Sequence, residues 1–190
     1  MNIIDKMREK IMDIINPDVE YSQEDFDNEF SNMNTVDNAF KLNIKFANKS
    51  NNYNPRYETN GSAGFDLRAN LDSDIVIPAK GGIAIIPTGL YFELPSNFEM
   101  QIRPRSGLAA KHGVTVLNSP GTIDSDYRGE IQVILINHGD FYFTVAHGDR
   151  IAQAVVASVI NQNIFNFIQV QDVSDDTKRS SGGFGSTGLR

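Results

Sequence analysis

From residue 41 onward the chain alternates short apolar runs with turn residues. The runs are rich in Ile, Val, Phe and Leu, and Gly, Pro, Asn and Asp stand between them. Many short strands with such punctuation are typical of an all-β sandwich, jelly roll or barrel, and not of a parallel α/β sheet. No convincing second helix is expected here. The predicted strand segments are 41–47, 74–78, 83–94, 98–102, 114–117, 131–137, 141–145 and 151–160.

Two of these runs, 131–137 and 151–160, carry apolar residues on both faces. A strand exposed on one side shows period-two alternation, so an apolar pattern on both faces predicts burial on both sides. A second subunit could bury the second face of these strands.

The first forty residues differ from the rest. Ile4, Met7, Ile11 and either Ile14 or Ile15 fall at helical spacing, which predicts an amphipathic helix over 2–15 that ends before Pro17. Its apolar stripe favours packing on the body or on a neighbouring subunit over an external partner. Residues 16–38 are acidic and rich in Asn and Ser, as in a linker.

Charge and composition exclude several classes of protein. The net charge of -7 comes from residues 1–40, which hold ten acidic and three basic residues, whereas residues 41–190 hold fourteen of each. A protein that grips a nucleic-acid backbone needs a basic excess, so we expect no nucleic-acid partner. With no Cys, and with its three His residues dispersed, the chain lacks the pattern of disulfide frameworks and zinc sites.

The sequence also gives no sign of a membrane partner. No apolar run approaches the roughly 20 residues that span a bilayer, and no signal-peptide pattern stands at the N-terminus. We therefore expect a cytoplasmic protein.

The last twelve residues, 179–190, combine arginine, hydroxyl groups and glycines around Phe184. Charge, hydroxyl donors, close backbone amides and one aromatic face suit a triphosphate and a flat base. A frayed terminus is the alternative, but disorder alone gives no reason for a large apolar ring. A P-loop fits poorly, because that motif needs a Lys before Ser or Thr and a helix after it.

Two internal segments also carry candidate chemistry. In Arg105-Ser106-Gly107 a hydroxyl and a small residue precede a possible helical turn, which suits an anion cradle as well as an ordinary strand-to-helix turn. Residues 121–131 predict a β-hairpin, with turn residues leading into an apolar run. Asp124 and Asp126 fall on the same side of an extended segment, so spacing does not choose between them.

Five segments in order, 63–68, 103–111, 118–129, 148–153 and 179–190, closely resemble the five motifs of the trimeric deoxyuridine triphosphatase (dUTPase) family. The resemblance covers residues 41–190. It implies a distorted jelly roll or β-clip barrel that carries an N-terminal helix extension. It further implies a β-domain over 41–172, a flexible arm over 173–190 that closes the site, and a homotrimer with sites shared between subunits. The acidic extension, 1–40, lies outside it.

The resemblance also implies the reaction, which is hydrolysis of dUTP to dUMP and pyrophosphate by attack of water on the α-phosphorus. Asp124 is the expected general base, and Asp126 is then expected to accept local N–H bonds in the turn. Mg²⁺ is the expected cofactor, with Asp66 steadying its waters; a structural hydrogen bond by Asp66 is the alternative. The implied substrate-binding residues are Arg105, Ser106, Gly107, Asn118, Gly121, Thr122, Ile123, Tyr127, Gln132, Gln153, Arg179, Phe184, Gly185, Ser186 and Thr187.

Individual roles follow from the same match. Ser106 and Gly107 are expected at the α- and β-phosphates, with Arg105 organising the site, and the 121–131 segment is expected to hold uracil. Tyr127 is expected to pack against the deoxyribose, although packing on its own strand is an alternative. Gln153 is expected to donate its amide to a phosphate oxygen.

The tail roles come from the same match. Arg179 is expected at the γ-phosphate, Phe184 over uracil, and Gly185, Ser186 and Thr187 at further phosphate oxygens.

Two expectations concern residues outside the site. Asp149 and Arg150 are expected to form an ion pair near the subunit interface, and Arg68 departs from many family members. The rival hypotheses are a dCTP deaminase-like enzyme of the same fold and a nucleotide-gated regulatory binding protein.

Overall fold

The computed structural model describes residues 43–160 and 165–183. The chain divides into two compact units, Met1–Val159 and Ile160–Arg190, which are described separately. The predicted helix over 2–15 and the linker over 16–38 lie outside the described residues, as do Phe184, Gly185, Ser186 and Thr187. The predicted domain boundaries stay predictions.

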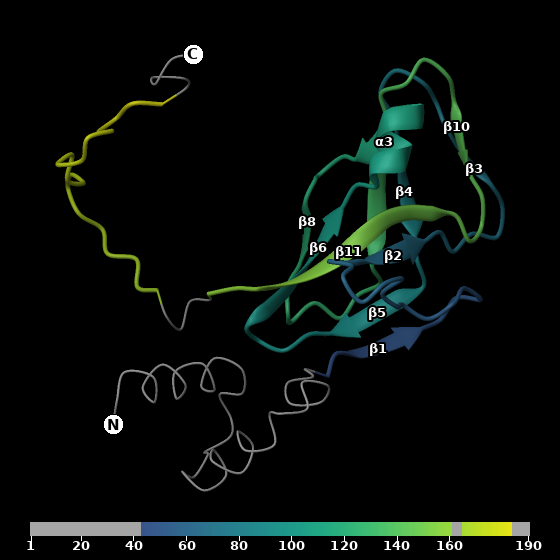
Figure 1. Ribbon diagram of the computed structural model, residues 1–190, viewed down its shortest axis with the longest axis horizontal. Coiled ribbons are helices and arrows are strands. Elements are labelled where there is room, and N and C mark those ends of the chain that lie inside the picture. The colour runs from purple at the N-terminus through teal and green to yellow at the C-terminus, as the bar shows by residue number, and fades with distance from the viewer. Residues whose placement is uncertain (1–42, 161–164, 184–190) are drawn as a thin grey trace, which may run out of the picture. The chain divides into compact units, whose positions relative to one another are not determined.

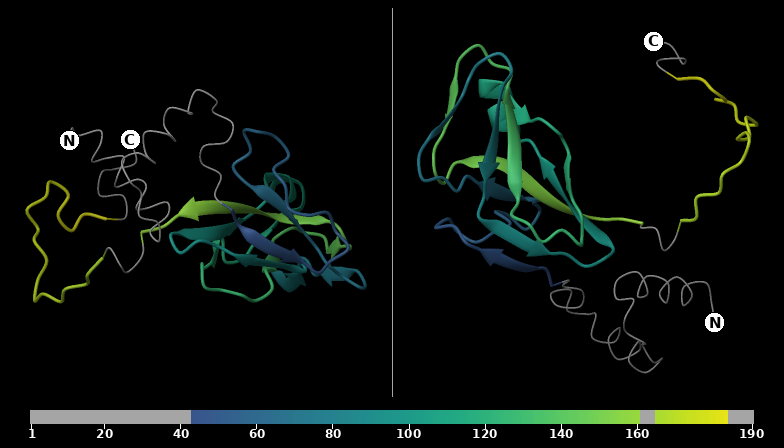
Figure 2. Two further views of the ribbon diagram at one scale, coloured as in Figure 1. Left: turned by 90° about the horizontal axis from the view of Figure 1, so that it is seen from below. Right: turned by 180° about the vertical axis from the view of Figure 1, so that it is seen from behind.

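The largest sheet of the first unit has four antiparallel strands in the order β2-β11-β6-β8 (Figure 1). Its strands are β2 (Phe65–Arg68), β6 (Phe98–Arg103), β8 (Gly121–Ile123) and β11 (Arg150–Ser158). The long, light-green β11 crosses the unit in each view of Figure 2 and pairs with a neighbour on either side. It therefore fixes the position of both β2 and β6.

A second sheet has three strands in the order β4-β9-β7, and two strand pairs complete the unit. The three strands are β4 (Gly82–Pro87), β7 (Val114–Val116) and β9 (Gln132–Asn137). The pairs join β1 (Lys45–Asn48) to β5 (Leu90–Glu93), and β3 (Ile75–Ile77) to β10 (Phe143–Val145). The prediction of an all-β jelly-roll fold is confirmed.

One hydrophobic core joins these strands. Its fully buried side chains include Leu67 of β2, Ile86 of β4, Met100 of β6, Leu135 of β9 and Ile151 of β11. Burying a side chain of this size stabilises a fold by about 1.5–3 kcal/mol relative to exposure. The apolar runs over 131–137 and 151–160 thus supply consecutive core positions in β9 and β11.

The predicted strand over 83–94 is two strands, because the chain turns at Thr88 and Gly89. The buried Thr88 hydroxyl donates to the Ile131 carbonyl at 2.7 Å and accepts the Leu90 N–H at 3.2 Å. Gly89 has φ +70°, and a Cβ there would lie 2.7 Å from that of Ser50. This turn carries the chain from the three-stranded sheet into the β1–β5 pair.

Two further expectations need correction, namely that no second helix forms and that residues 121–131 form a hairpin. The segment after Arg105 does form a helix, α3 (Ser106–His112), which has seven residues and ends at Gly113 in the left-handed region. The predicted hairpin over 121–131 is wrong, because β8 pairs with β6 whereas β9 pairs with β4 and β7. Residues 124–131 instead connect two sheets. Within the described part of the chain no helix has the length and apolarity to cross a membrane.

Asn137 is buried at the end of β9 and holds three backbone groups. Its Nδ2 donates to the carbonyls of Ile77 and Phe141, and its Oδ1 accepts the Gly139 N–H. Asn137→Ala leaves these groups unpaired, and an unsatisfied buried polar group costs about 1–3 kcal/mol. We expect the free energy of unfolding to fall by at least that amount in urea titration, with the exposed Asn51→Ala as the control. Equal stability of the two variants would contradict this assignment.

Candidate active site

The four-stranded sheet has one polar face. In the observed register Gln153 of β11 stands opposite Asp66 of β2 on one side and Arg103 of β6 on the other. Directly opposed residues of antiparallel strands point to the same side of a sheet. The alternate positions, among them Leu67 and Ile102, are buried in the core. The sheet therefore separates the core from a face that carries ionic and amide groups.

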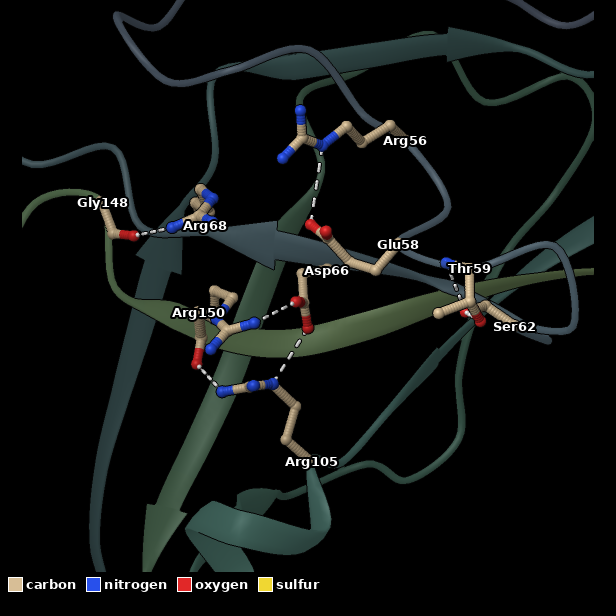
Figure 3. A network of polar contacts seen from close by, with 9 residues as sticks. All are labelled: Arg56, Glu58, Thr59, Ser62, Asp66, Arg68, Arg105, Gly148 and Arg150. Atoms are coloured by element: carbon tan, nitrogen blue, oxygen red, sulfur yellow. Dashed lines mark hydrogen bonds and ion pairs between the residues drawn. The ribbon is translucent and has the colours of Figure 1, made fainter.

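Asp66 joins two arginines on this face (Figure 3). Its Oδ1 lies 2.9 Å from Arg105 Nε, and its Oδ2 lies 3.1 Å from Arg150 Nη1. The Asp66 side chain is only 19% exposed, compared with 26% for Arg105 and 46% for Arg150. Two guanidinium groups share one carboxylate, so the cluster keeps a net positive charge, which favours an anionic ligand.

Strand β11 also holds the segment that leads into α3. Arg105 Nη1 donates to the Arg150 carbonyl at 2.9 Å, and Gln153 Nε2 donates to the Pro104 carbonyl at 2.8 Å. Arg105 itself is the extended residue directly before the helix, and its carbonyl accepts the first helical N–H bonds. The start of α3 is thus tied to β11 by both side-chain and main-chain contacts.

Ser106 and Gly107 present open donors at this helix start. Both residues are exposed, no side chain caps the helix, and neither N–H has a hydrogen-bond partner within the described residues. A Cβ at Gly107 would meet nothing within 4 Å. Unpaired N–H groups beside a positive cluster are suited to bind a phosphate.

Strand β8 forms the outer edge of the same sheet, next to β6. Gly121 pairs with Ile102, and its missing Cβ lets Asn118 Nδ2 and the Ile102 side chain approach closely. Thr122 and Ile123 continue the strand, opposite Gln101 and Met100. An edge strand leaves backbone N–H and C=O groups unpaired on its outer side.

Asp124 follows β8, and its carbonyl accepts the Tyr127 N–H at 3.1 Å in a tight turn. Its carboxylate is exposed and has no hydrogen-bond or ion-pair partner in the described ranges. The expectation that Asp126 holds this turn is wrong, because no local N–H donates to it there. Arg128 instead donates to the carbonyls of Ser125 and Tyr127, at 2.6 and 3.0 Å.

Tyr127 folds back over the residues that follow it. Its hydroxyl donates to the Glu130 carbonyl at 3.0 Å, and a Cβ at Gly129 would lie 2.3 Å from that hydroxyl oxygen. Gly129 is therefore needed for this ring position. The ring remains partly exposed, so local packing does not use its whole surface.

Two neighbouring arginines have partners that the sequence did not predict. The expected Asp149–Arg150 ion pair is wrong: Asp149 accepts the Ala146 N–H in a turn, which leaves Arg150 to pair with Asp66. Arg68 donates to the Gly148 carbonyl at 2.8 Å and links β2 to the turn before β11. An arginine at position 68, which differs from many family members, thus has a structural role in this chain.

The structure brings some of the predicted residues together within the first unit, and it describes the second unit by itself. Asp66, Arg105 and Gln153 meet around β11, with Ser106 and Gly107 next to them. Gln132 is exposed at the start of β9, in the other sheet. Arg179 belongs to the second unit, where its Nε donates to the Gly182 carbonyl. The four remaining tail residues lie outside the described ranges.

The contacts of Asp66 and Gln153 bear on the roles expected of these two side chains, at the waters of a metal ion and at a phosphate oxygen. Both Asp66 oxygens bind arginine and the Gln153 amide binds a main-chain carbonyl, so each side chain has structural partners here. Over residues 43–160 and 165–183, no group of three His, Cys, Asp or Glu side chains could hold a metal ion. The described residues therefore do not form a metal site made of protein carboxylates and imidazoles alone.

Arg103 and Arg150 were missed as candidates for the site. Arg103 lies on the polar face, where its guanidinium donates to Gln101 Oε1 at 2.6 and 3.0 Å. Arg150 stands within the motif-like segment 148–153. The motif was visible, but the pairing of Arg150 with Asp66, 84 residues away, depends on strand register.

Comparisons with known proteins agree with the geometry. The dUTPase family model matches residues 51–188. A deoxyuridine 5'-triphosphate nucleotidohydrolase of Rhizobium rhizogenes is 54% identical over 136 residues, which is 71% of this chain and 85% of that protein. The chain belongs to the dUTPase family.

Solved dUTPase structures share the fold. A Staphylococcus bacteriophage 80alpha dUTPase mutant with dUpNHpp has a TM-score of 0.68 at 18% identity, over 78% of this chain and 100% of that one. A mutant dUTPase of phage phi11 of S. aureus, whose structure describes a structural Mg(II) ion, has a TM-score of 0.60 at 16% identity, over 70% and 99%. The family model and the curated nucleotidohydrolases give no support to a deaminase or to a regulatory binding protein.

Proposed function

We propose that the protein hydrolyses dUTP to dUMP and pyrophosphate by attack of water on the α-phosphorus. The observation that carries the proposal is the pair of open N–H groups at Ser106 and Gly107, beside the positive Arg105–Asp66–Arg150 cluster, in a dUTPase-family chain. Displacement at phosphorus depends mainly on alignment and on neutralising charge as it develops. Fixed N–H donors and arginines supply both.

The triphosphate lies at the start of α3 in this proposal. Ser106 and Gly107 donate to the α- and β-phosphates, and Arg105 holds the helix start and adds positive charge. Gln153, which fixes the Pro104 carbonyl, can turn its amide toward a phosphate oxygen. Arg179 and the tail residues from Phe184 to Thr187 complete the phosphate and base contacts as a closing arm.

Asp124 is the general base. An exposed carboxylate with no partner in the described ranges is free to accept a proton from water, and it stands directly after β8. The water then attacks the α-phosphorus and pyrophosphate leaves. Asp66 is a poorer candidate for this role, because two guanidinium groups already occupy its oxygens.

The uracil lies along the outer edge of β8. Unpaired backbone groups of Gly121, Thr122 and Ile123 can match the polar edge of the base, and Asn118 Nδ2 lies close to Gly121. Gln132 would contribute from the start of β9, in the other sheet. The Tyr127 ring packs against the deoxyribose, where it leaves no room for a 2'-hydroxyl. This arrangement explains how a site made mostly of backbone can select one base and one sugar.

Mg²⁺ would be held mainly by the triphosphate and its own waters, and it would neutralise phosphate charge. Such a hard cation needs few protein ligands, which agrees with the lack of a carboxylate cluster in the described residues. Asp66, the family-matched candidate, would accept those waters at the lone pairs that its two arginine contacts leave free. Binding of dUpNHpp with and without Mg²⁺ tests this: equal affinity would contradict it.

The active unit is a homotrimer with shared sites. Ile83 and Ile85 of β4 and Leu117 beyond β7 are exposed, and register places them across from Ile136 and Ile134 of β9 on one sheet face. A contiguous exposed apolar face marks a protein contact. The second unit has exposed apolar residues of its own: Phe165, Phe167, Ile168, Val170 and Val173. Such a segment suits an arm that packs on a neighbour.

Replacing Asp124 separates binding from turnover. Asp124→Asn keeps the size of the side chain but removes the base, and loss of a positioned base costs about 10²- to 10⁴-fold in rate. We expect kcat to fall by that factor while dUpNHpp affinity is kept. Asp126→Asn, two residues away in the same turn, is the control and keeps the wild-type kcat. Full turnover by Asp124→Asn would reject the assignment.

Gly129→Ala tests the sugar contact without changing Tyr127. The added methyl displaces the Tyr127 hydroxyl, and the ring can rotate away because it is partly exposed. Loss of a fitted wall relaxes selectivity, so the ratio of kcat/KM for dUTP to that for UTP should fall by about tenfold or more. Gly61→Ala, where a Cβ meets nothing within 4 Å, is the control. An unchanged ratio would exclude Tyr127 from sugar selection.

The trimer depends on the apolar face in this proposal. Ile85→Asp places a charge there, and burying an unpaired charge is strongly unfavourable. We expect this variant to sediment as a monomer at concentrations where the wild type and Ile85→Val sediment as trimers. A trimeric Ile85→Asp variant would remove this face from the contact.

A further inference from the structure

Arg150 contributes to the site twice, through two different atoms. Its carbonyl accepts a hydrogen bond from Arg105 Nη1 at 2.9 Å, and its own Nη1 donates to Asp66 Oδ2 at 3.1 Å. The other Asp66 oxygen binds Arg105 Nε at 2.9 Å. Arg105 is therefore held on one side by the main chain of Arg150, and on the other by a carboxylate that the Arg150 side chain orients (Figure 3).

The three residues come from separate parts of the chain. Asp66 lies in β2, Arg105 lies directly before α3, and Arg150 is the first residue of β11. The register of β11 shifts between Arg150 and Ala152, so this end of the strand is irregular. From Ala152 onward, regular strand pairing aligns β11 with β2. At the irregular end, the side-chain contact between Arg150 and Asp66 can supply part of this alignment.

We propose that Arg150 is a positioning residue of the phosphate site: it orients Asp66, which fixes Arg105 and the start of α3, and it does not touch the substrate. The proposal rests on the proposed function, because the phosphate groups are what the start of α3 would bind. A displacement of about 1 Å in a catalytic group can cost on the order of 10²-fold in rate, so orientation alone can matter here.

Exposure argues for positioning over stability. The Arg150 side chain is 46% exposed, and ion pairs with an exposed partner contribute little to stability because water screens them. Loss of this pair should therefore change the thermal unfolding midpoint only slightly. Asp66, by contrast, is mostly buried, and without Arg150 its carboxylate would be held at Oδ1 alone, by Arg105, among the described residues.

The test compares Arg150→Met with Arg68→Met. Both changes remove one positive charge and one hydrogen bond, but Arg68 bonds the Gly148 carbonyl and does not contact Asp66. We expect Arg150→Met to lower kcat/KM for Mg²⁺–dUTP by about tenfold, mainly in kcat, whereas Arg68→Met keeps the wild-type value. Arg150→Lys should recover most of the loss, because the contact uses a single nitrogen.

A double-mutant cycle with Asp66→Asn shows whether Arg150 acts through Asp66. If it does, adding Arg150→Met to Asp66→Asn costs less than about twofold more, whereas independent action would multiply the two losses. Multiplicative losses, an unchanged kcat/KM in Arg150→Met, or an equal loss in Arg68→Met would each overturn the proposal.

Two further readouts separate the possible failures. A drop in the unfolding midpoint that matches the loss of activity, and that Arg150→Lys does not restore, would show a merely structural role and overturn the proposal. A wild-type protein that does not hydrolyse dUTP would instead overturn the proposed function. Wild-type turnover together with an unaffected Arg150→Met variant would overturn the positioning role alone.

Discussion

The pairing of β11 with β2 on one side and β6 on the other is the constraint on which the site depends. It buries the small side chains of Ala152 and Ala154 in the core and places Gln153 between Asp66 and Arg103 on the opposite face. Because opposed residues in antiparallel strands share a side, the same ladder that closes the core also assembles the polar face. Stability and site geometry therefore come from one register.

The electrostatics of the site depends on this strand pairing. One mostly buried carboxylate holds two guanidinium groups and leaves a net positive cluster at the start of a short helix with unpaired N–H groups. The protein side chains of this cluster leave one positive charge uncompensated, which suits a polyphosphate. The base side of the proposed site uses backbone instead, at the edge strand β8, where selection depends on shape and not on charge.

Turn chemistry explains most differences between expectation and structure. Thr88 and Gly89 split one apolar run into two strands, because a buried hydroxyl replaces ladder bonds and a positive φ redirects the chain. Arg128 holds the turn assigned to Asp126, since its guanidinium reaches two carbonyls at once. Neither the alternation of apolar residues nor the motif carries this information.

The sequence by itself determined the all-β class, the family and the positions of most strands, because alternation, turn residues and ordered motifs are local properties of the chain. Tertiary structure alone decided that Arg150 pairs with Asp66 and not with Asp149, and that β8 joins β6 and not β9. These outcomes depend on which strands lie next to each other and in what register. A sequence specifies such long-range pairings only through the energy of the whole core, so no local pattern displays them.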